Sequence, residues 1–168
     1  TSDIARIGFA MGQKGTCSRL LTTVFGAPIT YASFGDAVAP GQLSMDVLMN
    51  CYRVPELNDG CLIYGIAGKD VNHSRELEVM NQQLKKKQLN AVCIPLESLE
   101  LDELLAVLEA LNIKGIQLED PLKEIAIDKF YGSGSFPGTS VFMEISSFNG
   151  KQEINIYPIS GEKFVEHL

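Results

Sequence analysis

Apolar, strand-like segments alternate with helix-like segments through the second part of the chain, and this alternation restricts the possible folds more than any other feature. The strand-like segments are 62–67, 91–95 and 115–118, and the helix-like segments between them are 75–88 and 99–111. Segment 99–111 places its leucines at the spacing of a helix with one apolar face. Strands that alternate with helices in this way form βαβ units. We therefore predict an α/β fold with a mostly parallel sheet.

The end of the chain has a different pattern. Residues 141–147 and 152–157 are strand-like and lie on either side of Asn149-Gly150. Both residues of this pair tolerate the positive φ that tight hairpin turns require. Short helices are expected after Pro121 and over residues 161–168. We predict that the sheet is completed by a C-terminal hairpin.

The first part of the chain carries its own strand–helix pattern. Two strands are expected at 6–10 and 29–33, and two helices at 18–25 and 45–52, the second with Ser44 as its N-cap. Residues 53–60 (RVPELNDG) are polar and contain proline and glycine, as linkers do. We therefore expect one structural unit over residues 1–54, a linker over 55–60 and a second unit over 61–168.

Composition and charge exclude several classes of protein. The 168 residues are 45% apolar, which is enough for a packed core, and the net charge of −7 argues against a nucleic-acid partner. No apolar run approaches the roughly 18 residues of a membrane span, so no membrane association is expected. The four cysteines form no CxxC pair, which predicts reduced thiols, no metal site and a cytoplasmic protein.

One candidate ligand site combines Arg19 with Gln42. Arg19 follows a glycine-containing turn between a strand-like and a helix-like segment, and Gln42 lies on a loop after the second strand-like segment. A planar guanidinium suits a carboxylate, so two such loops could share one anionic ligand. A structural turn with a surface arginine is the alternative that these residues leave open.

The segment MGQKGTCSRLLTTVFGAPITYASFGDAVAPGQLS resembles the C-terminal end of type I 3-dehydroquinate dehydratases, whose pattern is MGxxGxxSR, then FG, T and SAPGQ. The resemblance implies the terminal strand–helix piece of a (β/α)8 barrel, with Arg19 on the substrate carboxylate and Gln42 as a substrate-binding amide. Val38 stands where the family has serine. The family's Schiff-base lysine lies upstream of the residues present here.

The segments YGIAGKDVNHS and GIQLEDPLKE resemble the YGxxGxPVSHS and GxNVTxPxKE motifs of shikimate dehydrogenases. The resemblance implies an α/β substrate-binding domain. Asn72 and Ser74 would hold the substrate carboxylate, Gln117 would be a substrate-binding side chain, and Lys123 would be the catalytic lysine. The family's catalytic aspartate falls on Ser160. Because acids surround Lys123 in sequence, a solvated helix lysine is an equally open interpretation.

Together these resemblances predict a bifunctional, cytoplasmic protein of the shikimate pathway of aromatic amino acid biosynthesis, with lyase and oxidoreductase relatives. The chain is expected to be a fragment that binds 3-dehydroquinate, 3-dehydroshikimate or shikimate. The partner would be the missing barrel or NADP domain, in cis or in trans. No cofactor is expected in this chain because it has no GxGxxG motif, and NADP is expected only in a full-length dehydrogenase. The alternative is a catalytically dead module with a packing or dimerisation role.

Overall fold

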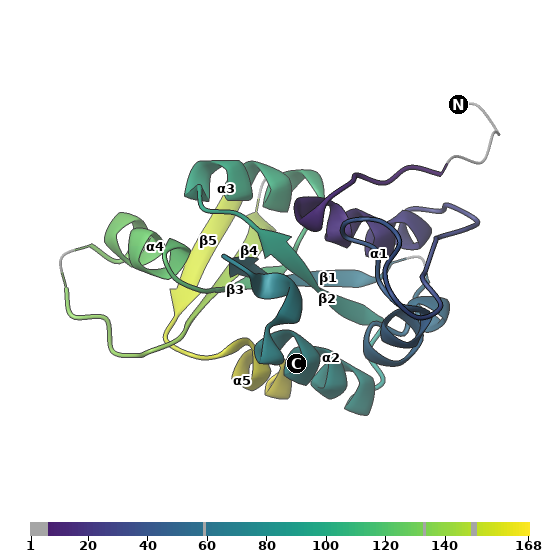
Figure 1. Ribbon diagram of the computed structural model, residues 1–168. Coiled ribbons are helices and arrows are strands. Elements are labelled where there is room, and N and C mark those ends of the chain that lie inside the picture. Colours follow the sequence, from purple (N-terminus) through teal and green to yellow (C-terminus); the bar gives the residue numbers. More distant parts are fainter. Residues whose placement is uncertain (1–6, 59, 133, 149–150) are drawn as a thin grey trace.

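A computed structural model describes residues 7–58, 60–132, 134–148 and 151–168 (Figure 1). Its centre is a five-stranded sheet in the order β2-β1-β3-β4-β5. The strands are β1 (Leu62–Gly68), β2 (Ala91–Glu97), β3 (Gly115–Leu118), β4 (Val141–Phe148) and β5 (Lys151–Tyr157). Strand β1 pairs in parallel with β2 and β3, whereas β4 runs antiparallel to both β3 and β5. The sheet is therefore mixed, which corrects the expectation of a mostly parallel one.

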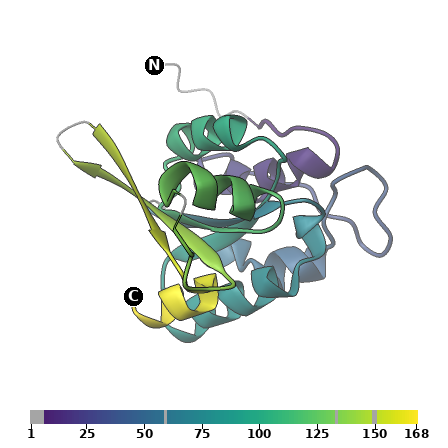
Figure 2. The ribbon, with the colours of Figure 1, turned by 90° about the vertical axis from the view of Figure 1, so that its left-hand side faces the viewer.

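Helices cover both faces of this sheet, as Figures 1 and 2 show. Helices α2 and α5 lie on one face, and α1, α3 and α4 lie on the other. The bounds are α1 (Thr16–Val24), α2 (Arg75–Lys86), α3 (Leu101–Ala110), α4 (Leu122–Phe130) and α5 (Gly161–Glu166). The central strands are apolar along their length because both faces are covered, and Ile66, Ile94 and Ile116 are completely buried.

The C-terminal hairpin forms as predicted from its two strand-like segments. Strands β4 and β5 pair antiparallel from Phe142↔Tyr157 to Phe148↔Lys151, and the ribbon extends away from the body of the molecule (Figure 2). The predicted Asn149-Gly150 turn lies outside the described residues. At its other end the hairpin is held by Phe142, which is fully buried and stacks on Phe164 with a centroid separation of 4.1 Å.

The two strands expected in the first part of the chain do not form. Residues 7–10 and 29–32 have no strand structure, and Ser33 makes only an isolated bridge to Ser44. Arg6, the start of the first expected strand, lies outside the described residues. A strand exists only when a neighbouring strand satisfies its backbone groups. Within the described residues no such neighbour lies beside these segments, so they run as irregular chain.

Two short helical segments follow in place of one longer α-helix. Ser44 caps the predicted helix as expected, since the Val47 N–H donates to Ser44 Oγ at 3.2 Å. The chain then continues as the π-helical segment η2 (Val47–Cys51) and, after two residues, as the 3-10 turn η3 (Val54–Glu56). Leu48 and Val54 from these segments, and Tyr52 between them, belong to the same buried core as the sheet.

Arg53 fastens this connection to the edge of the sheet. Its backbone is left-handed, with a φ of 53°, and its side chain is buried. The guanidinium donates to the Ala91 carbonyl at 3.0 Å and to the Leu89 carbonyl at 3.4 Å, and it pairs with Glu56 at 3.4 Å. The residues around the expected linker are thus packed against the start of β2. In the described part of the chain, no helix is both long enough and apolar enough to cross a membrane.

Candidate functional site

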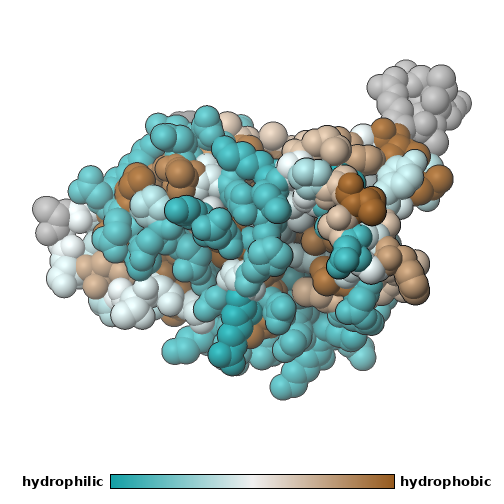
Figure 3. Space-filling model, viewed as in Figure 1, coloured by the Kyte–Doolittle hydropathy of each residue, from teal (hydrophilic) through white to brown (hydrophobic). Residues whose placement is uncertain are grey.

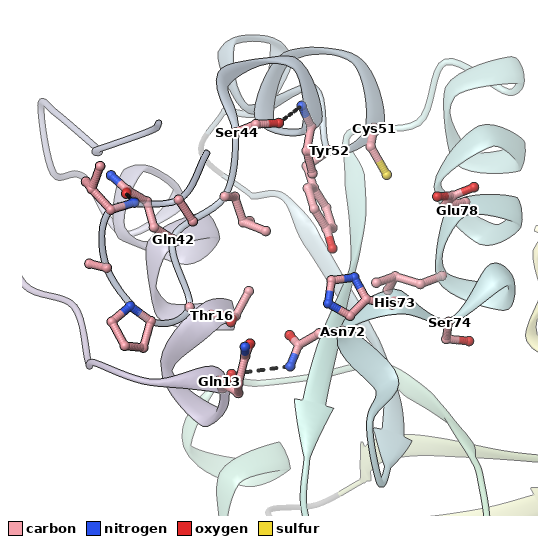
Figure 4. A pocket seen from close by; sticks show the side chains of 18 residues that line it. Gln13, Thr16, Gln42, Ser44, Cys51, Tyr52, Asn72, His73, Ser74 and Glu78 are labelled. Atoms are coloured by element: carbon pink, nitrogen blue, oxygen red, sulfur yellow. Dashed lines mark hydrogen bonds between the residues drawn. The ribbon is translucent and has the colours of Figure 1, made fainter. Parts of the chain in front are cut away.

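A cleft of about 660 Å³ lies where the first part of the chain meets the second. We call it the interface cleft (Figure 4). Four parts of the chain surround it: the start of α1, the loop through residues 37–44, η2 with the adjoining Tyr52, and the 3-10 turn η4 (Val71–His73) with the beginning of α2. Its polar lining residues are Gln13, Thr16, Gln42, Ser44, Cys51, Tyr52, Asn72, His73, Ser74 and Glu78.

Three residues that the sequence assigned to substrate binding line this cleft, namely Gln42, Asn72 and Ser74. Each is engaged within the chain. Gln42 Oε1 accepts from the Val38 N–H at 2.9 Å, and Ser74 Oγ donates to the Glu76 carboxylate at 2.8 Å. Asn72 Nδ2 donates to the carboxylate of Glu97 and to the Gln13 carbonyl. The structure therefore brings these three residues to one cleft. None of the residues that line this cleft is a lysine or an arginine.

The charge of the interface cleft is acidic. Among the described residues that line it, Glu78 is the only carboxylate, and neither lysine nor arginine is present. Burial, with a smaller contribution from Glu78, raises the pKa of the Cys51 thiol to about 11. Burial also raises the pKa of Tyr52. Both groups therefore stay neutral near pH 7 and add no negative charge to that of Glu78.

Arg19 lies elsewhere and has an unusual environment. The residue is 3% exposed, and its guanidinium stacks over the Phe9 ring at 4.3 Å from the centroid. One terminal nitrogen approaches Met11 Sδ at 3.6 Å, and the buried Nε has no hydrogen-bond partner within the described chain. No carboxylate of the described residues pairs with it. Arg19 does not line the interface cleft, so Arg19 and Gln42 are not brought to one cavity.

A second, smaller cleft of about 350 Å³ brings together two other predicted residues, Gln117 and Ser160. We call it the glutamate cleft, because Glu76, Glu119 and Glu162 line it beside a single Arg75. Gln117 is buried; its Oε1 accepts from the Gly161 N–H at 2.7 Å, and its Nε2 donates to Glu119 at 2.7 Å.

The remaining predicted residues in this part have structural partners. Ser160 accepts a hydrogen bond from the Lys163 N–H at 3.3 Å and so caps α5. Lys123 lines neither cleft; its ammonium lies 3.0 Å from Asp120 and 3.9 Å from Glu124. The structure therefore does not place Lys123 beside Ser160. No group of three or more histidine, cysteine, aspartate or glutamate side chains suited to a metal ion occurs among the described residues.

The sequence did not identify Thr16 and Glu78 as residues of the interface cleft, or Glu162 as a residue of the glutamate cleft. Thr16 lies inside the glycine-containing motif, but nothing in the motif distinguishes it from its neighbours. Glu78 follows the 71–74 turn by one helical turn, which places it on the same wall. Glu162 could have been found only by knowing that α5 packs against α2, a contact between distant segments.

Comparisons with known proteins agree with both halves of this arrangement. The family model for type I 3-dehydroquinase matches residues 1–59. The chain is 30% identical over 128 residues to the chloroplastic bifunctional 3-dehydroquinate dehydratase/shikimate dehydrogenase of Arabidopsis thaliana. It is 31% identical over 122 residues to the shikimate biosynthesis protein AroDE of Chlamydia pneumoniae. These matches cover 75% and 70% of this chain.

The chain spans only 21% of the Arabidopsis protein and 25% of the Chlamydia protein. A shorter match, 42% identical over 52 residues, covers 30% of this chain and 24% of the 3-dehydroquinate dehydratase of Methanocaldococcus jannaschii. Among solved structures, the dehydroquinate dehydratase and shikimate dehydrogenase from S. pombe aligns with a TM-score of 0.46 and 23% identity. That alignment covers 91% of this chain and 29% of the S. pombe chain.

Proposed function

We propose that this chain, a relative of bifunctional 3-dehydroquinate dehydratase/shikimate dehydrogenases, supplies the carboxylate-binding arginine of a dehydratase-like site, and that Arg19 is that residue. Its substrate class is a small cyclic carboxylic acid of the dehydroquinate or shikimate type. The observation that carries the proposal is the buried guanidinium of Arg19, which has no acidic partner among the described residues. It lies in the segment that matches the type I 3-dehydroquinase family.

The chemical argument rests on the cost of burying a charge. A buried cation without a counter-ion is unfavourable, whereas a carboxylate would form charge-assisted, bidentate hydrogen bonds with the guanidinium. The Phe9 ring, at 4.3 Å, holds the guanidinium plane in one orientation without neutralising it. Arg19 would therefore bind and orient the acid. The Schiff-base chemistry of the family would need a lysine that does not lie in the matching part of this chain.

The exposed apolar side chains of the first part support the proposal that a further segment of protein packs against them. Phe25, Ile29 and Tyr31 are each more than half exposed, and Phe34 is 98% exposed. We infer that residues 1–54 are the terminal piece of a (β/α)8 barrel, and that these side chains pack against the rest of such a barrel, in cis or in trans. The relatives support this, since the dehydratase of M. jannaschii is about four times longer than the matched segment. A cytoplasmic location is part of the same proposal, as is NADP binding by a longer dehydrogenase.

The glutamate cleft favours the first part over the second as the place where an acid binds. Three glutamates and one arginine line that cleft, so a carboxylate entering it would meet net repulsion. Lys123, the candidate catalytic residue, would have to leave Asp120 before it could exchange a proton with a substrate. Asn72 Nδ2, the Ser74 hydroxyl proton and the buried amide of Gln117 already hold partners within the chain, so these groups would donate to a substrate only after exchanging them.

The test is a binding titration with 3-dehydroquinate and with shikimate, followed by NMR of arginine Nε–H groups. It is run on the chain alone and with the upstream dehydratase portion supplied in trans. We expect the Arg19 signal to shift and Arg19→Met to weaken binding at least about tenfold. Arg75→Met, which removes the arginine of the glutamate cleft, is the matched control and should leave binding unchanged. A loss caused by Arg75→Met instead, or no shift of Arg19 in either arrangement, would contradict the proposal.

A further inference from the structure

The guanidinium of Arg19 has a single, weak hydrogen-bond partner within the described chain, the thioether of Met11. A terminal nitrogen of Arg19 lies 3.6 Å from Met11 Sδ, and no carboxylate of the described residues pairs with the guanidinium. A thioether sulfur is a weak acceptor, whereas a guanidinium forms its strongest hydrogen bonds with oxygen acceptors. A better acceptor placed at the position of Met11 Sδ would therefore bind Arg19 more strongly than Met11 does now.

The segment that carries Met11 is held against the helix that carries Arg19. The Ala10 N–H donates to Ser18 Oγ at 2.8 Å, and Ser18 precedes Arg19 in α1. The Phe9 ring lies under the guanidinium, 4.3 Å from the centroid to the guanidinium carbon. The two residues before Met11 are thus fixed beside Arg19, so the thioether stays within reach of the guanidinium.

Met11 is also open to reagents in solution. Its side chain is among the exposed ones, with 62% of the residue accessible. Met45 and Met49 are exposed as well, but within the described chain no arginine or lysine donates to either sulfur, and Met80 and Met143 are completely buried. Met11 thus combines access for a dissolved oxidant with contact to a buried cation.

Oxidation changes the chemistry of this contact. Hydrogen peroxide transfers one oxygen atom to the sulfur, so an S–O bond forms, the peroxide O–O bond breaks and water leaves; the sulfur is oxidised and the peroxide is reduced. The product is a polar sulfoxide whose oxygen accepts hydrogen bonds far better than the thioether sulfur. Because this oxygen is covalently held beside the guanidinium, it competes with a free carboxylate at high effective concentration.

We propose that Met11 is a site of reversible oxidation, and that its sulfoxide binds the Arg19 guanidinium and lowers the affinity of this site for a carboxylate. The effect on affinity rests on the proposed function of Arg19, whereas the oxidation and the new contact can be measured without any acid. Reversal needs a thiol-dependent methionine sulfoxide reductase, which removes the oxygen as water while two thiols become a disulfide.

The experiment treats the chain with hydrogen peroxide, and peptide mass spectrometry identifies the methionines that gain an oxygen atom. NMR of arginine Nε–H groups follows Arg19 without acid present. Shikimate and 3-dehydroquinate are then titrated before and after oxidation, with the upstream dehydratase portion supplied in trans. We expect Met11 to be oxidised, the Arg19 signal to move, and the affinity for the acids to fall about five- to tenfold. Methionine sulfoxide reductase with dithiothreitol should restore the signal and the affinity.

Two substitutions separate Met11 from the other side chains that peroxide can oxidise. Met11→Leu keeps the cysteines and the other exposed methionines, and neither its Arg19 signal nor its affinity should respond to peroxide. Met45→Leu is the matched control, since it removes an exposed methionine that has no arginine contact within the described chain, and it should respond as the wild type does. Urea denaturation of each variant checks that the fold is kept.

Three results would overturn the proposal. Met11 could stay a thioether while Met45 and Met49 are oxidised, the Arg19 signal could be unmoved when Met11 is oxidised, or the response to peroxide could persist in Met11→Leu. Failure of the proposed function looks different: neither acid binds the untreated chain, yet oxidation of Met11 still moves the Arg19 signal. If the acids bind equally well before and after oxidation of Met11, the carboxylate site stands and its control by Met11 is wrong.

Discussion

Residues 7–49 and the sheet-containing part of the chain bury their apolar side chains very differently. Of the sixteen large apolar side chains that are exposed among the described residues, ten lie between Ile7 and Met49. Figure 3 shows brown, apolar groups gathered at the side of the molecule where these residues lie. The sheet, by contrast, encloses a continuous core between two helical layers. Most apolar side chains of the sheet are thus enclosed, whereas much of the apolar surface of the first part is exposed, which is what our proposal of a partial barrel predicts.

The largest expected effect is on the free energy of unfolding, when the same substitution is made at two different phenylalanines. Phe142 is completely buried and Phe34 is 98% exposed. We expect Phe142→Ala to lower the free energy of unfolding by about 3–5 kcal/mol, because it leaves a cavity beneath Phe164. Phe34→Ala should change it by less than about 0.5 kcal/mol. Urea denaturation followed by circular dichroism measures both. A loss above about 1 kcal/mol for Phe34→Ala would show that the loop around Phe34 is packed in solution, which would contradict the difference between the two parts of the chain.

Two buried arginines give the next largest difference. Arg53 donates to two carbonyls and pairs with Glu56, whereas Arg19 has no carboxylate or carbonyl partner for its guanidinium in the described chain, although the Nε of each is buried without a partner there. We expect Arg53→Met to cost about 2–3 kcal/mol, since it leaves the Ala91 and Leu89 carbonyls unpaired. Arg19→Met should cost less than about 1 kcal/mol, or should stabilise the chain, because it removes an uncompensated charge. Equal losses in the two variants, measured by urea denaturation, would mean that Arg19 has a structural partner in solution.

A smaller effect tests whether the two parts stay joined around Cys51. Its pKa is raised from 9.0 to about 11 in the folded chain, so the thiol ionises more readily when the chain is unfolded. The corresponding stabilisation is fully present below pH 9 and is lost as the pH rises from 9 through 11. We expect a loss of about 1 kcal/mol across this interval, since the half-buried position is partly screened by solvent. Cys51→Ala should remove this part of the pH dependence. An identical slope in wild type and variant would indicate that residues 45–52 detach from α2.

The sequence predicted the elements of the second part well, because their patterns are local. Strands β1, β2 and β3 and helices α2 and α3 lie within two or three residues of the expected ranges. The antiparallel pairing of β4 with β3 was not predicted, since it depends on which distant segments meet. The prediction of strands at 6–10 and 29–33 was wrong for a related reason. Apolar character shows that a segment suits a strand, but it does not show that a neighbouring strand exists to pair with it.

The sequence predicted which residues could bind a ligand, but not which of them lie together in one cleft. The motifs singled out Gln42, Asn72 and Ser74, and the structure places them in one cleft. That grouping results from the packing of the first part against the turn at 71–74, which no local pattern contains. Arg19, in contrast, does not line the cleft that Gln42 lines. The same packing also gives Thr16 and Glu78 a place in the cleft, although neither carried a signal in the sequence.

The buried side chain of Arg53 has a mechanical consequence. A flexible linker lets the parts on its two sides reorient freely, but here Arg53 is held by the carbonyls of Leu89 and Ala91 at and just before the start of β2. This connection is therefore not a flexible hinge. Turning the first part against the sheet would have to break these hydrogen bonds, so a movement of this kind is coupled to the release of a buried guanidinium.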